Sequence, residues 1–226
     1  SEAAQPQEMM QGIARLLKEA GVAKPEMQSH MLSNESGPAI DTAGVLEALR
    51  AIPMAAKINP ETGYREQLPE QSLAELIKTT TNLSSASLNE RTQSSIALLS
   101  MMFSRLEQED SIAGPMKPLI NDLQLPILNR ALQDDGFFAD AENSAQQLVN
   151  EIAKAGAHWT PKQSASRDPL YKKVVAIIED IKARFDGEDD VFDENLQVLN
   201  EFLEREERRS GLLEERIIEA EEAKGR

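Results

Sequence analysis

Apolar residues recur every three or four positions along most of the chain, which is the spacing of one face of an α-helix. The first such run predicts a helix over residues 7–20. Residues 23–39 have few large apolar side chains and predict a loop. Asp41 or Thr42 can cap a short second helix, which Pro53 ends.

The middle of the chain predicts the centre of the core. A turn is expected at residues 59–63, because an Asn-Pro start and a glycine favour one. Pro69 suits the first position of a helix. Ser87 and Glu90 have the spacing of a capping box, so a long helix is expected over residues 88–109.

Proline and aspartate mark the later boundaries. Pro126 must kink or split the helix around it, because proline lacks a backbone N–H and clashes with the preceding turn. Phe137 and Phe138 are expected to enter the core from a turn. Asp168, followed by a proline, predicts a capped helix start. The last helix is predicted over residues 190–223.

No stretch alternates polar and apolar residues as a half-buried strand would. The predicted fold class is therefore all-α: a multi-helix bundle with a long, partly protruding C-terminal helix of heptad-like spacing. Residues 1–68 are predicted to hold N-terminal helices with flexible linkers. The helical bundle is assigned to residues 69–203, and the charged projecting end of the last helix to residues 204–226.

The acidic balance of the chain limits its partners. The 226 residues carry a formal net charge of −15 and include no cysteine. An acidic surface repels phosphate backbones, so nucleic-acid binding is not expected. The densest basic run, Arg205 to Arg209, is interrupted by Glu206 and Glu207. No stretch approaches the roughly 20 apolar residues of a membrane-spanning helix, so no membrane insertion is expected. The absence of cysteine is compatible with a cytoplasmic location.

Catalytic and cofactor motifs are missing from the sequence, which predicts a protein that is not an enzyme and needs no cofactor. His30 and His158 stand alone, without the partners of a catalytic or metal site. An acidic cluster could suggest a divalent cation; its members are Asp186, Glu188, Asp189, Asp190, Asp193 and Glu194. Its sixth position, Val191, departs from a calcium-binding loop, and acids also gather at helix starts because the helix dipole favours them. No metal site is predicted.

The aromatic residues allow one alternative. Phe137, Phe138 and Trp159 could line a pocket for a small ligand or nucleotide, although core packing is the commoner role of such side chains.

The last helix carries the most informative functional pattern. Its apolar residues alternate between four- and three-residue steps over about four heptads, with polar residues at two of these positions, Glu206 and Ser210. This pattern fits a partner-binding or dimeric coiled coil, and it also fits a bundle helix with a solvated end. For a contact with a protein partner or a second copy, the predicted residues are Leu199, Leu203, Leu213 and Ile217.

Several segments resemble the DUF1631 family, a largely uncharacterised bacterial family of long chains. They include LQLPIL at residues 123–128, Phe137-Phe138, LVNEIA at 148–153 and DPLY at 168–171. The resemblance extends over roughly residues 88–226. One stretch departs: where the family shows His-Pro-Ala-Arg-Arg-Leu-Leu, residues 143–149 read NSAQQLV, without the basic groups.

Taken with the resemblance, these features lead to one main functional hypothesis. We expect a non-enzymatic helical interaction or scaffold module within a larger bacterial cytoplasmic protein. The alternative is a regulatory domain that responds to a small ligand or nucleotide at the aromatic residues.

Overall fold

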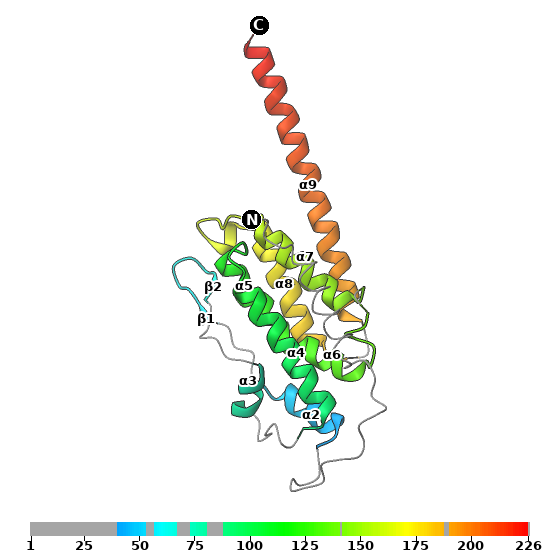
Figure 1. The fold of residues 1–226 in the computed structure, drawn as a ribbon. Helices are drawn as coiled ribbons and strands as arrows, with labels where there is room; N and C mark the ends of the chain where they lie inside the picture. The colour runs from blue at the N-terminus through cyan, green and yellow to red at the C-terminus, as the bar shows by residue number, and fades with distance from the viewer. Residues whose placement is uncertain are drawn as a thin grey trace.

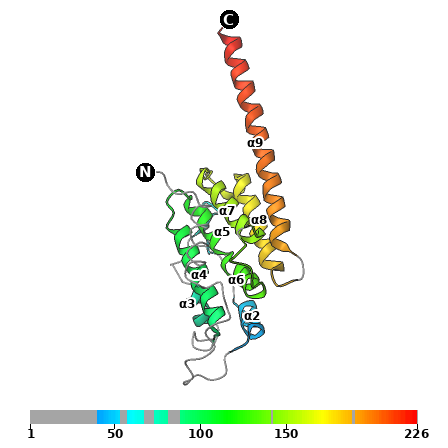
Figure 2. The same ribbon diagram turned by 45° about the vertical axis from the view of Figure 1, so that its right-hand side comes forward.

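A computed structural model shows a bundle of helices from which one long helix projects (Figures 1 and 2). It describes residues 40–52, 57–66, 73–80, 88–140, 142–187 and 190–225. The helices are α2 Thr42–Arg50, α3 Leu73–Thr80, α4 Glu90–Glu107, α5 Lys117–Asn121, α6 Gln124–Gln133, α7 Ser144–Ala157, α8 Pro169–Arg184 and α9 Val191–Lys224. Two short 3-10 helices, η2 Gly114–Met116 and η3 Ala165–Arg167, and two strands, β1 Lys57–Ile58 and β2 Arg65–Glu66, complete the described elements. The predicted helical fold class, with its long C-terminal helix, is confirmed.

One hydrophobic core joins the described elements. In its middle α4 packs against α3, α5 and α6, while α9 packs on α7 and α8. Phe103, Leu119 and Leu148 are among its most deeply buried side chains. Val45 and Tyr64 belong to the same core, so described residues before position 68 pack with those after it. The predicted three-part division of the whole chain stays a prediction, and the helix and loop expected over residues 7–39 lie outside the described residues.

Side-chain caps explain where most helices begin. Of the two residues predicted as possible caps of α2, Asp41 is the cap, and it accepts a hydrogen bond from Gly44 N at 2.9 Å. Asp168 caps α8 by accepting from Tyr171 N at 3.1 Å, also as predicted. His158 is the C-cap residue of α7, while His30 lies outside the described residues.

The predicted cap of α4 is wrong. The N-cap is Asn89, whose side chain accepts a hydrogen bond from Thr92 N at 2.8 Å, and the helix therefore starts at Glu90. Asparagine caps helices as well as serine does, and Asn89 stands at the required distance from Thr92. Ser87 lies outside the described residues.

Pro126 splits its segment, as expected. The chain leaves the helical ladder between α5 and α6, and Pro126 becomes the third residue of α6. There its missing N–H is harmless, because the first N–H groups of a helix have no partner within the helix. Downstream, Phe137 is buried and Phe138 packs partly buried against the core. This confirms the expectation that both side chains enter the core from a turn.

A small hairpin interrupts the helical architecture, and here the expectation of no strand is wrong. β1 and β2 pair antiparallel around the predicted turn. The Asn59 side chain accepts a hydrogen bond from Thr62 N at 3.0 Å, and Gly63 has a φ of 74°, which suits glycine. Strands of two residues each are too short to show the alternation that identifies a strand in a sequence.

Candidate functional site

The start of α9 is fixed to the bundle by a polar network. Arg184, at the end of α8, binds Asp180 at 2.7 Å and Glu194 of α9 at 2.6 Å. Asn195 of α9 also donates to Asp180, at 2.8 Å. The hydrogen bonds from Arg184 and Asn195 lower the pKa of Asp180. These contacts set the direction in which α9 leaves the bundle.

The first half of α9 is part of the core. Phe192, Leu196 and Leu199 are buried, and Leu199 has no exposed surface. Leu203 packs partly buried against the same core. Two of the four predicted contact residues, Leu199 and Leu203, therefore pack within their own bundle.

The second half of α9 stands clear of the other described elements (Figures 1 and 2). Leu213 and Ile217, the other two predicted contact residues, are 51% and 57% exposed, and their role in partner binding stays a prediction. Leu212 and Ile218 are also more than half exposed. The 34 residues of α9 span about 50 Å. Within the described part of the chain, neither α9 nor any other helix is long and apolar enough to cross a membrane.

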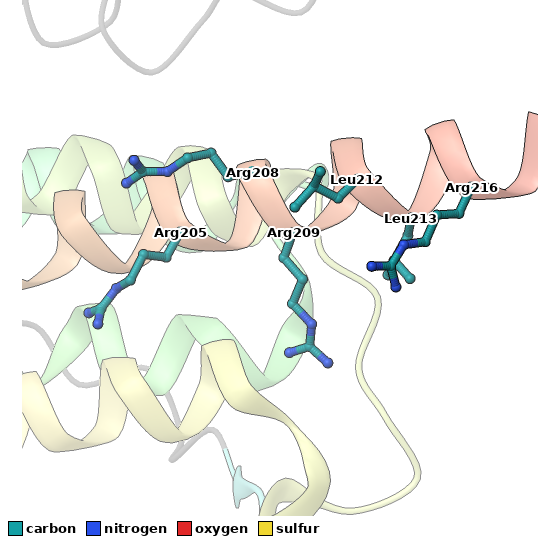
Figure 3. Close-up of a pocket in the computed structure, with 6 residues that line it drawn as sticks. All are labelled: Arg205, Arg208, Arg209, Leu212, Leu213 and Arg216. Carbon is teal, nitrogen blue, oxygen red and sulfur yellow. The ribbon is translucent and has the colours of Figure 1, made fainter.

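Four arginines of this half share a surface that forms only because the segment is helical. Arg208 and Arg209 follow Arg205 by three and four residues, and Arg216 follows Arg209 by seven, so a helix brings them to one side. Together with Leu212 and Leu213 they line a shallow hollow to which α9 alone contributes (Figure 3). Reading Arg205 to Arg209 as an interrupted run missed this surface. Glu207 lies on the far side of the helix, and Glu206 lies beside the surface, 3.9 Å from Arg209. The i, i+3, i+4 spacing of the arginines is the signal that could have found it.

The other concentration of polar chemistry surrounds Asp168, which is 1% exposed. Its carboxylate accepts hydrogen bonds from Tyr64 Oη at 3.0 Å, Trp159 Nε1 at 3.0 Å, Lys162 N at 3.2 Å and Tyr171 N at 3.1 Å. The Trp159 ring stacks on Tyr171, with centroids 6.1 Å apart. Burial, reinforced by the hydrogen bond to Asp168, raises the pKa of Tyr64 to about 12. All four donors bind the same carboxylate, so this cluster holds the hairpin, the loop after α7 and the start of α8 together.

A partly buried ion cluster lies beside it. Arg65 binds both Asp122 and Glu179, and Lys182 lies 3.5 Å from each of these carboxylates. Burial raises the pKa of Asp122 against the pull of the two cations. For Glu179, burial is outweighed by Arg65 and Lys182, and its pKa is lowered. Two cations facing two carboxylates are mutually satisfied, which suits a structural role better than capture of an anion.

The structure does not bring the three aromatic residues of the suggested pocket together. Phe137 lies at the start of α7, where its carbonyl accepts from Asn143 Nδ2 and Gln146 Nε2. Trp159 follows the other end of α7 and joins the Asp168 cluster. The 14 residues of α7 separate these ends by about 20 Å. The suggestion of a pocket lined by Phe137, Phe138 and Trp159 is therefore wrong. These residues are close in the sequence, but α7 lies between them and holds them near its opposite ends.

The acidic cluster before α9 serves as partner to arginines. Asp186 pairs with Arg50 at 3.3 Å, and Asp190 with Arg130 at 3.2 Å. Asp190 also caps α9. Residues 188–189 lie outside the described part. Among the described residues no three potential metal ligands gather into a site.

Comparison with known proteins identifies one family. Its model is described as "Protein of unknown function (DUF1631) 2nd domain" and matches residues 39–188. The match starts earlier than the resemblance seen in the sequence, and it ends before α9. No curated protein and no solved structure matches the chain.

Proposed function

The chain belongs to the DUF1631 family, and we propose that it is a non-enzymatic protein-interaction module whose binding surface is the projecting half of α9. We place it in a larger bacterial cytoplasmic protein. The observation that carries the proposal is the exposure of Leu213 and Ile217, which continue the apolar face that the bundle buries at Leu199. Exposed apolar side chains in a regular helical row are the usual anchors of helix–helix recognition.

The rest of the molecule supports this assignment. The two dense polar clusters, around Asp168 and Arg65, are occupied by their own internal partners. The projecting half of α9, by contrast, contributes no buried side chain to the core. A helix that only completed the bundle could end near Leu203.

Affinity capture of the full chain from its source cells tests the proposal. Replacement of Leu213 and Ile217 by lysine should remove the captured partner while leaving the bundle folded, because neither residue contributes to the core. Leu212→Lys is the control, since Leu212 is similarly exposed at 59% but points away from the face that Leu199 and Ile217 share. An unchanged set of partners after the double replacement would refute the proposal.

A further inference from the structure

The face of α9 that packs on the bundle continues uncovered along the projecting half. Residues at alternating steps of four and three from Leu199 and Leu203 remain on this face. We call this exposed continuation the seam; it consists of Glu206, Ser210, Leu213, Ile217, Ala220 and Lys224. Leucine at one seam position and isoleucine at the next give it an apolar middle.

Opposite charges border the two sides of the seam. With a turn of about 100° per residue, Arg209 and Arg216 fall together on one side, which we call the Arg flank. Glu207, Glu214 and Glu221 fall together on the other side, the Glu flank. Charges at these flanking positions set the choice and direction of a partner helix in coiled coils.

A second copy of α9 running parallel is excluded by the bundle. Phe192, Leu196 and Leu199 use the same face to pack on α7 and α8. A parallel copy in register would have to place its own residues 191–203 where α7 and α8 already lie. The bundle therefore blocks the one arrangement in which arginine flanks would meet glutamate flanks of an identical helix.

A second copy running antiparallel brings like charges together. In an antiparallel pair each flank meets the same flank of its partner. With Leu213 facing Ile217 of the other copy, Glu214 would face its own equivalent and Glu207 would face Glu221. The Arg flank would likewise place Arg216 beside its equivalent. Like charges at neighbouring positions destabilise such pairs.

We propose that the seam binds a helix of a different protein, with acidic residues along the side that meets the Arg flank and basic residues along the side that meets the Glu flank. The middle of that helix supplies apolar side chains to Leu213 and Ile217. The inference rests on the proposed function and adds the chemistry of the partner. It also makes the isolated chain a monomer.

Disulfide exchange measures this preference, because the chain has no cysteine of its own. Ser210→Cys in the full chain provides one thiol at a seam position. Two synthetic helical peptides of equal composition compete for it in a glutathione buffer. Each has leucine along its middle and one cysteine in its first turn, so that only a parallel peptide stays clear of the bundle. One peptide presents glutamate to the Arg flank and lysine to the Glu flank, and the other has these two sides exchanged.

The complementary peptide should form about fivefold or more of the mixed disulfide, because several flanking pairs change from attraction to repulsion. Moving the cysteine to the last turn makes the peptides antiparallel, and the preference should invert. Arg209→Glu with Arg216→Glu should reduce the preference. Arg205→Glu with Arg208→Glu, the same charge change away from the flanks, should leave it intact. Equal amounts of both disulfides, or a dimer in sedimentation of the unmodified chain, would overturn the inference.

The outcomes separate this inference from the proposed function. If replacement of Leu213 and Ile217 abolishes partner capture but the peptides compete equally, the seam binds partners without the charge rule. If capture is unaffected by that replacement, the proposed function itself fails.

Discussion

Removal of the Asp168 carboxylate should be one of the most damaging single changes in the bundle. This side chain is 1% exposed and serves four donors from three separate segments. Asp168→Ala deletes the cap of α8 and leaves the Trp159 and Lys162 N–H groups without an acceptor. Tyr64 Oη keeps one alternative, since it also donates to the Lys162 carbonyl at 3.2 Å.

The cost follows from these groups. Loss of a helix cap destabilises by about 1 kcal/mol. Trp159 Nε1 and Lys162 N are only partly buried, so each adds about 1 kcal/mol, the low end of the cost of an unpaired donor. With the cap and these two donors together, we expect Asp168→Ala to lower the free energy of unfolding by about 3 kcal/mol. Asp168→Asn keeps one acceptor oxygen, so its loss in free energy of unfolding should be about half as large.

Urea unfolding of the full chain, followed by far-ultraviolet circular dichroism, measures the difference. Asp41→Ala is the matched control, because Asp41 caps α2 in the same way but its contact is exposed. That control should cost about 1 kcal/mol or less. If Asp168→Ala costs no more than Asp41→Ala, the buried carboxylate does not organise the cluster and the reasoning is wrong.

Three further outcomes follow from the structure. The pKa of Tyr64 is raised to about 12, so its stabilising effect should be complete below about pH 10 and disappear as the pH rises through about 12. Tyr64→Phe should reduce this dependence in alkaline unfolding, and Tyr171, whose pKa is also raised by burial, should account for the remainder. Leu199→Ala should cost about 3 kcal/mol in urea unfolding, whereas Leu213→Ala should change stability by less than about 0.5 kcal/mol. Gly156→Ala places a Cβ 2.9 Å from a methionine Cγ and should destabilise by about 1 kcal/mol, whereas Gly211→Ala meets no atom within 4 Å and should raise helicity.

Local signals predicted much of the fold because they act over a few residues. Asp168 before a proline predicted the start of α8, and Pro126 predicted a break in its helix. Capping and helix breaking both depend on backbone groups within one turn. The cap of α4 was misassigned because Ser87 and Asn89 are both acceptable caps and only the fold selects between them. The hairpin was missed because its pairing depends on a turn and not on a strand pattern.

Contacts between distant segments could not be predicted in this way. Tyr64 and Asp168 are more than a hundred residues apart in sequence, and nothing in either neighbourhood indicates that they meet. Trp159 is close to Phe137 in the sequence, yet its ring stacks on Tyr171, on the far side of the loop after α7. An aromatic residue shows that a large side chain needs burial, but it does not show which element buries it.

The heptad pattern of α9 illustrates the same limit at the candidate site. Such a pattern specifies an apolar face without specifying what covers that face. At Leu199 the cover is α7 and α8, whereas at Leu213 and Ile217 none of the described elements supplies one. Polar residues at Glu206 and Ser210 mark the change, because they stand where the helix leaves the bundle. Retention of two large apolar side chains at seam positions beyond that point favours a partner outside the bundle over a merely solvated end.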